Sequence, residues 1–262
     1  MKYILGAITG DIIGSIYEFD NIKTMDFPLF SEGCCETDDS IMTFATMDVL
    51  INKGDYTETY QRYGRKYPDP DYGGYGENFN EWIRTTKPRP YNSWGNGSAM
   101  RVSPVAWCCN NLDDVMAMAK MSAEVTHNHP EGIKGAQSTA AAIYMARIGK
   151  SKDEIKSFIT DTFAYDLDRK INDIRPTYKF DVSCQGSVPE AIIAFLESTD
   201  FENAIRLAVS IGGDSDTIAC ITGGIAEAYY KAIPEYIIEN VFNILPENLI
   251  EIIEEFSTRY KK

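Results

Sequence analysis

The sequence has only two histidines, few basic residues and no long uncharged apolar run. Of its 262 residues, 25 are Lys or Arg and 39 are Asp or Glu, so the formal net charge is −14. A surface of this charge repels a nucleic-acid backbone, because such binding depends on Lys and Arg displacing counterions. We therefore expect no general DNA or RNA binding, and any bound phosphate must be held locally.

The apolar runs are too short for a membrane span or an export signal. The C-terminal candidate, 217–226, ends at Glu227, whereas a spanning helix needs about 18 apolar residues. Near the N-terminus, Asp11 interrupts the apolar stretch before a signal-peptide core is complete. The sequence thus predicts a soluble, cytoplasmic protein with no membrane partner.

Cysteine and histidine are poorly arranged for disulfides or zinc. Four of the six cysteines form the adjacent pairs Cys34–Cys35 and Cys108–Cys109, which are unsuited to joining distant loops. The histidines, His127 and His129, stand two residues apart before a proline, which is not a zinc-binding spacing. We expect reduced thiols and no zinc.

Apolar residues recur at helical spacing along most of the chain. Leu245, Leu249, Ile252 and Phe256 form the stripe of an amphipathic C-terminal helix. Helix-forming residues predict further helices at 3–17, 38–52, near 78–85, and at 112–124, 131–148, 152–164, 189–197, 201–211 and 216–231. Only 179–184 resembles a strand. The sequence therefore predicts one all-α domain over residues 1–262, with a monomer favoured.

Two acidic motifs each stand directly before an apolar helix. They are Glu36–Ser40 and Gly212–Thr217. Helix capping is one explanation, since Thr37 and Asp214 are favoured N-cap residues. However, a cap does not need two adjacent acids such as Asp38 and Asp39, and carboxylates at buried helix ends need a compensating cation. Oxygen ligands without His or Cys favour Mg²⁺ or Mn²⁺, and acids projecting in several directions suit two ions.

Three further features are candidates for a site, each with a structural alternative. The turn at 95–98 would point backbone N–H groups at an anion, with glycine allowing close approach and positive φ and with Arg101 adding charge; taken alone, such a turn is more typical of a structural loop. His127 is either a substrate-binding or acid–base group, or a partner of a helix end before Pro130. Glu18, seven residues after Asp11 on a glycine-rich helix, is otherwise a salt-bridge partner.

Taken together and in this order, these segments resemble the ADP-ribosylglycohydrolases. The matching stretches span nearly the whole chain and are GAITGDIIGSIYEF at 6–19, TDDS at 37–40, YGGYGENFNEW at 72–82, GNGSAMRVSPVAW at 95–107, THNHPEGIKGAQSTAAAIYMAR at 126–147 and GGDSDTIACITGGIAEAYY at 212–230. The resemblance implies an all-α orthogonal multi-helix bundle with two Mg²⁺ or Mn²⁺ ions in a cleft.

The same resemblance implies roles for individual residues. The implied metal ligands are Thr37, Asp38, Asp39, Asp214, Asp216 and Thr217, and Ser215 would point away from the ions. The loop Gly95, Asn96, Gly97 and Ser98 would hold diphosphate and ribose, and His127 would contact the substrate. Glu18 matches an acidic residue that only some members place near the metals. An adenine-stacking residue is left open among Tyr72, Tyr75 and Trp94.

The implied reaction is hydrolysis of the N- or O-glycosidic bond between ADP-ribose and an acceptor such as a modified protein side chain. Asp39 or a metal-coordinated water would activate the nucleophile, and Glu18 would act in catalysis or gating. Hydrolysis of small ADP-ribose or ribosyl conjugates is the alternative reaction. A non-catalytic, crystallin-like relative is another alternative, although suitable ligand types stand at all six metal positions.

Overall fold

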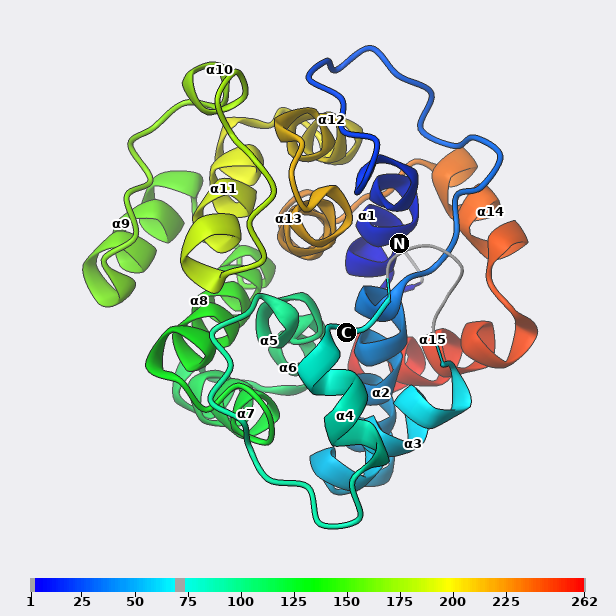
Figure 1. Cartoon of the computed structure of the whole chain (residues 1–262). Helices are drawn as coiled ribbons and strands as arrows, with labels where there is room; N and C mark the ends of the chain where they lie inside the picture. The colour runs from blue at the N-terminus through cyan, green and yellow to red at the C-terminus, as the bar shows by residue number, and fades with distance from the viewer. Residues whose placement is uncertain (1–2, 69–73, 262) are drawn as a thin grey trace.

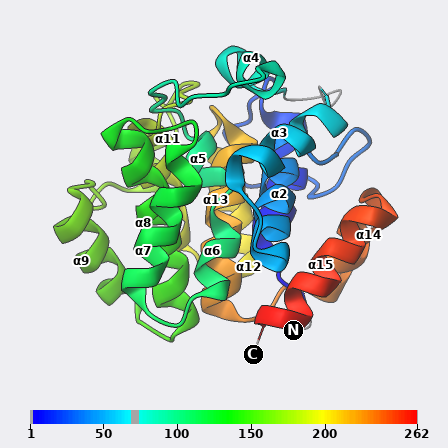
Figure 2. The ribbon, with the colours of Figure 1, turned by 90° about the horizontal axis from the view of Figure 1, so that it is seen from below.

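The computed structural model describes residues 3–68 and 74–261, and within these residues the secondary structure is helical, without a strand. The helices are α1 (Gly6–Gly14), the 3₁₀ helix η1 (Ser15–Tyr17), α2 (Asp38–Asn52), α3 (Tyr56–Lys66), α4 (Glu77–Arg84), α5 (Gly97–Met100), α6 (Ser103–Cys108), α7 (Leu112–Glu124), α8 (Pro130–Arg147), α9 (Lys152–Phe163), α10 (Ile171–Ile174), α11 (Cys184–Glu197), α12 (Phe201–Ile211), α13 (Ser215–Tyr230), α14 (Glu235–Ile244) and α15 (Glu247–Tyr260). The predicted all-α multi-helix bundle is confirmed (Figures 1 and 2). The described helices include none with the length and apolarity that a membrane crossing requires.

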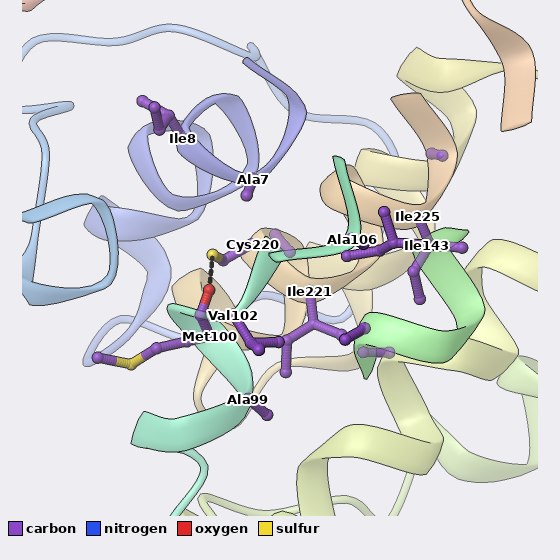
Figure 3. Close-up of a cluster of buried hydrophobic side chains, with 14 of the residues drawn as sticks. Ala7, Ile8, Ala99, Met100, Val102, Ala106, Ile143, Cys220, Ile221 and Ile225 are labelled. Atoms are coloured by element: carbon purple, nitrogen blue, oxygen red, sulfur yellow. Dashed lines mark hydrogen bonds between the residues drawn. The ribbon is translucent and has the colours of Figure 1, made fainter. Parts of the chain in front are cut away.

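Helix α13 lies in the middle of the molecule and packs against α1, α8, α11 and α12 (Figure 1). Its residues are buried from Ser215 to Ala228, as expected for a helix composed mainly of small and apolar residues. Ile221 and Ile225 point toward Val102, Ala106 and Ile143, which come from the α5–α6 segment and from α8 (Figure 3). Because α13 is packed against other helices along its length, the position of its N-terminus is fixed by these contacts.

The closest packing in the bundle is between α1 and α13. Gly6, Gly10 and Gly14 lie at every fourth position of α1, on one face of the helix. A Cβ atom at Gly10 would lie 2.0 Å from the carbonyl oxygen of Ala219, and one at Gly14 would lie 2.5 Å from Cα of Asp216. The two backbones are thus in direct contact, and no side chain larger than hydrogen fits between them.

A buried ion pair holds the N-terminus of α1. Glu227 Oε2 accepts hydrogen bonds from the N–H groups of Leu5 (3.0 Å) and Gly6 (2.6 Å). Its other oxygen, Oε1, pairs with Lys261 Nζ at 2.8 Å. A carboxylate at a helix N-terminus satisfies N–H groups that lack an intrahelical partner and interacts favourably with the helix dipole.

Five of the described α-helices were not predicted: α3, α14 and the short helices α5, α6 and α10. The sequence of α3 contains three Tyr, two Thr and one Gly, which are weak helix formers. The helix forms because the Asp55 side chain accepts the N–H of Glu58 (2.9 Å) and because Tyr56, Tyr60 and Tyr63 bury one face. Tertiary packing therefore outweighs propensity here. The prolines Pro234 and Pro246 bound α14, whose burial depends on Ile237, Ile238 and Val241.

The strand predicted at 179–184 is wrong. Gly95 and Ser183 form an isolated antiparallel bridge, with the Asn96 N–H donating to Val182 O (2.8 Å) and the Cys184 N–H to Trp94 O (2.9 Å). The segment is extended, but the pairing stops because Cys184 begins α11 and Gly97 begins α5. Helix α11 consequently starts five residues before the predicted position, with Pro189 inside it.

The α1–α13 contact predicts a large stability loss for Gly10→Ala. The added methyl would force two backbones apart, and overpacking of this kind costs about 1–3 kcal/mol or more. For a chain of this size we expect the melting temperature to fall by several degrees, at about 2–4 °C per kcal/mol. Thermal unfolding followed by circular dichroism measures the change.

Gly54→Ala is the matched control, because a Cβ at Gly54 would make only ordinary contacts, 3.4 Å from Thr59 Oγ1 and 4.0 Å from Val49 Cα. Its free energy of unfolding should stay within about 0.5 kcal/mol of wild type. Equal melting temperatures for Gly10→Ala and wild type would contradict the described contact.

Candidate metal centre and adjoining cleft

The two acidic motifs meet because their helices begin at the same place in the fold. Thr37 is the N-cap of α2, and its Oγ1 accepts the N–H of Asp39 at 3.3 Å. Asp214 is the N-cap residue of α13, but its side chain makes no capping hydrogen bond. Capping therefore accounts for Thr37 and not for Asp214, whose carboxylate is directed elsewhere.

Asp11, Asp39 and Asp216 form the first group of carboxylates. All three are buried, and one oxygen from each lies within 4.8 Å of the others. Asp39 Oδ2 accepts the hydroxyl of Thr217 (3.2 Å), whereas its Oδ1 is buried without a hydrogen-bond partner among the described residues. Burying a carboxylate oxygen without a hydrogen-bond partner costs free energy unless a ligand binds to that oxygen.

Glu18, Asp214 and Asp216 form a second group with the same spacing limit, so Asp216 belongs to both groups. Glu18 follows η1 directly and lines a cavity, and its Oε2 has no hydrogen-bond partner among the described residues. The salt-bridge alternative finds no support, since no Lys or Arg of 3–68 or 74–261 pairs with Glu18 within 4.0 Å.

Asn21 fixes Glu18 beside the second acidic motif. Its Nδ2 donates to the carbonyls of Glu18 (2.8 Å) and Gly213 (2.9 Å), and its Oδ1 accepts the N–H of Gly213 (2.6 Å). Gly213 has a φ of 76°, a left-handed conformation that favours glycine. One amide side chain therefore links the segment after α1 to the turn before α13.

Asp11 organises the N-terminus of α2. Its Oδ1 accepts the Thr37 hydroxyl at 2.6 Å, and its Oδ2 accepts the N–H groups of Thr37 (3.0 Å) and Ser40 (3.1 Å). The Thr37 hydroxyl hydrogen is thus committed to Asp11, which leaves lone-pair density on its oxygen for a cation. Asp38, half-buried, lines the cavity beside these residues.

Burial and mutual repulsion raise the pKa of these carboxyl groups. Burial is the largest cause for Asp38, Asp39 and Asp216, whose pKa values lie well above the usual range, and neighbouring negative charges raise them further. Burial, followed by the charges of Asp214 and Asp11, raises the pKa of Glu18 to about 8. Without a cation, simultaneous ionisation of these carboxyl groups is therefore unfavourable.

The residues present fit a divalent metal centre. All donors are oxygens, and two carboxylate oxygens, Asp39 Oδ1 and Glu18 Oε2, have no hydrogen-bond partner among the described residues. No Lys or Arg in the described part of the chain forms an ion pair with any of these acids. A ligand set composed only of oxygens favours hard cations such as Mg²⁺ and Mn²⁺. Two overlapping groups of three carboxylates offer room for more than one ion.

A cavity of about 410 Å³ opens above the acids, a volume typical of small-molecule sites. Its walls include Gly95, Asn96, Gly97 and His127 on one side and the start of α4 on another. Helix α4 stands at this end of the bundle, as Figure 2 shows. The structure thus brings the acidic motifs, the glycine loop and His127 together around one space.

The residues of the loop 95–98 differ in whether and how they contact the cavity. Asn96 Nδ2 donates to Asp214 Oδ2 (2.6 Å) and to Ser187 Oγ (3.1 Å), so its side chain positions an acid. Ser98 is buried and donates to Gly132 O (2.7 Å), away from the cavity lining. Neither Gly95 nor Gly97 has the positive φ that was expected. A Cβ at 97 would lie 3.1 Å from His127 Nε2, a tight contact, so glycine at this position lets the loop and the imidazole approach each other closely.

His127 lies on the cavity wall with its Nδ1 2.7 Å from Thr126 Oγ1. Burial and the adjacent positive charge of Arg101 hold the pKa of His127 well below its usual value, so the imidazole stays neutral. Arg101 borders the cavity, but its Nη2 donates to Ser122 O (2.9 Å) and Thr126 Oγ1 (2.8 Å). Its expected contact with an anion stays a prediction.

Of the aromatic residues considered for stacking, Tyr72 lies outside the described residues. Tyr75 is buried in the cavity wall, and Trp94 is 53% exposed with its ring 5.7 Å from that of His129.

Ser215, which was expected to point away, donates its hydroxyl to Tyr17 O (3.2 Å). Asn21 and Thr126 were not identified as important, because an isolated Asn or Thr carries no pattern in the sequence.

Comparison with known proteins places these features in context. The profile of the family described as ADP-ribosylglycohydrolase matches residues 1–262. The chain is 27% identical over 312 residues to ADP-ribosylhydrolase ARH3 of Bos taurus, covering 88% of this chain and 85% of that protein. It is also 27% identical to the putative ADP-ribosyl glycohydrolase L543 of Acanthamoeba polyphaga mimivirus, with 92% and 89% covered.

A solved structure titled "ADP-ribosylglycohydrolase-related protein complex" is similar in fold. Its TM-score is 0.71 at 22% identity, and the alignment covers 99% of this chain and 98% of that one.

The acidic groups predict that Mg²⁺ or Mn²⁺ raises the melting temperature. A cation that binds only the native state stabilises it by about 2.7 kcal/mol at a concentration 100 times its Kd. At about 2–4 °C per kcal/mol, the expected shift is several degrees. Thermal unfolding after exhaustive chelation, with and without added metal, measures the effect.

Asp39→Asn should abolish most of this shift, because it removes a charge from the first group. Asp161→Asn, at an exposed acid of α9, should retain it. A wild-type melting curve that does not respond to millimolar metal would rule out the centre, as would equal responses in the two variants.

Proposed function

The chain belongs to the ADP-ribosylglycohydrolase family, and from that membership we propose that it hydrolyses the glycosidic bond between ADP-ribose and an acceptor side chain of a modified protein, with two divalent cations, Mg²⁺ or Mn²⁺. The observation that carries the cation requirement is the pair of overlapping carboxylate groups, whose acids form no ion pair with any Lys or Arg of the described residues. The proposal that the acceptor is an N- or O-linked protein side chain is based on the family resemblance. The continuous apolar cluster of the described residues supports a single domain.

The proposed ligands of the cations are Thr37, Asp38, Asp39, Asp214, Asp216 and Thr217. Bound there, the cations would orient the ribose hydroxyls and stabilise developing negative charge. Asn96 holds one carboxylate of the set, Asp214, through a 2.6 Å hydrogen bond, and Asp11 holds Thr37. These partners keep the oxygens in place before any ligand enters.

Cleavage of the glycosidic bond develops positive charge on the ribose ring, so the reaction needs nearby negative charge, a base for water and a proton for the leaving group. The surrounding carboxylates provide the negative charge. Asp39, with its unpartnered Oδ1, is the proposed base for the attacking water. Glu18, on the cavity wall with its own unpartnered oxygen, is the proposed second acid–base group.

The opposite wall is proposed to bind the rest of the substrate. Gly95 and Gly97 allow the diphosphate and ribose to approach the backbone, and Ser98 contributes only through its backbone. His127 offers its Nε2 to the same space. The exposed ring of Trp94 at the loop is the proposed platform for adenine, because a solvent-exposed aromatic face can stack on a base.

A panel of substrates tests this function. The protein is incubated with Mg²⁺ and with peptides ADP-ribosylated on serine or on arginine, and separately with a small ADP-ribose conjugate. Chromatography then distinguishes release of ADP-ribose from release of phosphate. ADP-ribose released from one peptide class and lost after chelation supports the proposal. Turnover of the small conjugate alone favours the alternative substrate class, and no turnover of any substrate favours a non-catalytic relative.

Glu18→Gln separates catalysis from binding. Loss of an acid–base group lowers turnover by about 10²–10⁴-fold, while Asp39, Asp214 and Asp216 remain to bind metal. We therefore expect ADP-ribose and metal affinities to fall much less than turnover. Steady-state kinetics and calorimetry on the same preparation measure both quantities.

Glu32→Gln is the matched control, since Glu32 is an exposed acid on the loop after η1. It should retain wild-type turnover. Near-wild-type turnover of Glu18→Gln in a folded, metal-bound protein would remove Glu18 from the reaction.

A further inference from the structure

Arg101, Thr126 and His127 form a hydrogen-bonded chain of side chains at the wall of the cavity. Arg101 Nη2 lies 2.8 Å from Thr126 Oγ1, and Thr126 Oγ1 lies 2.7 Å from His127 Nδ1. A guanidinium group has only donors, so Arg101 donates and the Thr126 oxygen accepts. The hydroxyl hydrogen of Thr126 therefore remains to be donated to another atom.

His127 Nδ1 is the acceptor for that hydrogen. Thr126 is fully buried, and the described residues offer its hydroxyl no other acceptor within hydrogen-bonding distance. Since the hydroxyl donates to Nδ1, this nitrogen carries no proton. A neutral imidazole with a bare Nδ1 has its hydrogen on Nε2.

The Nε2 edge of His127 faces the cleft. It lies 3.1 Å and 3.5 Å from the positions that Cβ atoms on Gly97 and Gly95 would occupy, and both glycines line the cavity with it. Nε2 makes no hydrogen bond with any described residue. A ligand oxygen that enters between the glycines would therefore meet an N–H group.

We propose that Arg101 and Thr126 are positioning residues that fix His127 as the Nε2–H tautomer, so that His127 donates a hydrogen bond to a substrate oxygen and does not accept a proton from it. This proposal rests on the proposed function, because it takes the cleft as the ADP-ribose site. The chemical class recognised is an oxygen acceptor, such as a diphosphate or a ribose oxygen.

The surroundings of Arg101 support this assignment. Arg101 is 1% exposed, and no carboxylate of the described residues lies within 4.0 Å of it. Its guanidinium instead stacks on Tyr60 at 4.3 Å, and Tyr60 OH is held by Thr46 (2.9 Å) and Ser122 (2.8 Å). The charge is held by neutral groups, so its field still acts on His127 and disfavours a charged imidazolium.

Nitrogen-15 NMR of the histidine side chains tests the tautomer directly in the ligand-free full chain. The spectrum is simple, because the sequence holds only two histidines. His129→Asn assigns the signals, since Asn can replace His129 as the N-cap of α8. We expect His127 Nδ1 to show the shift of an unprotonated nitrogen and Nε2 that of an N–H. A protonated Nδ1 at neutral pH would overturn the proposal.

A pair of Thr126 variants tests the positioning role. Thr126→Val keeps the shape and removes the hydroxyl, whereas Thr126→Ser keeps it. We expect Thr126→Val to populate the Nδ1–H tautomer and to weaken ADP-ribose binding about tenfold, the loss of one hydrogen bond. Thr126→Ser should stay within about twofold of wild type in affinity and keep the wild-type spectrum.

A merely structural role of Thr126 would lower the melting temperature of Thr126→Val without changing the two ring nitrogens, and that result would contradict the proposal. If wild-type protein failed to bind ADP-ribose at all, the proposed function would fail. The spectrum of the free protein would still decide the tautomer, so the two failures are distinguishable.

Discussion

The direct backbone contact between α1 and α13 is the constraint on which the rest of the site depends. Gly14 of α1 rests on the backbone of Asp216, and Asp11 lies one turn away on the same helix. Because the helices touch without intervening side chains, carboxylates from two remote parts of the chain are brought within 4.8 Å of each other. A bulkier interface would separate these oxygens by ångströms and leave no shared position for a cation. The glycine spacing of α1 is therefore a requirement of the site as well as of the packing.

The site has two walls of opposite character. One wall carries buried carboxylates whose charges repel each other, and the other carries Arg101, its neutral partners and a neutral histidine. Asn96 lies between them, since its backbone belongs to the glycine loop and its side chain donates to Asp214. This division is consistent with the proposed binding of an anionic ligand by a strongly acidic protein. The negative charge is concentrated where cations are proposed to bind, and donors line the facing loop.

Local patterns were sufficient to predict much of the fold and the identities of the acidic motifs. The apolar stripe of α15 and the cap at Thr37 follow from the chain's immediate neighbourhood, and both are observed. Features that depend on long-range contacts were not predictable. Helix α3 is stabilised by buried tyrosines despite weak propensity, the 179–184 segment is extended without becoming a strand, and Ser98 turns away from the cleft. Asn21 and Thr126 matter only because of partners brought to them by the fold, so no sequence spacing identifies them.

The capping of α1 by Glu227 has a consequence for synthesis of the protein. The N–H of Leu5 and its acceptor are separated by 222 residues, and the α1–α13 contact spans a similar interval. During translation the first helix therefore emerges long before the surface that receives it, with three exposed glycines that weaken it in isolation. Contacts of such high sequence separation form late, and partly made chains expose apolar surface until then. A ribosome-bound chain that ends before α13 has neither the bundle's central helix nor half of the acidic site, so chaperone dependence should be greatest in that interval.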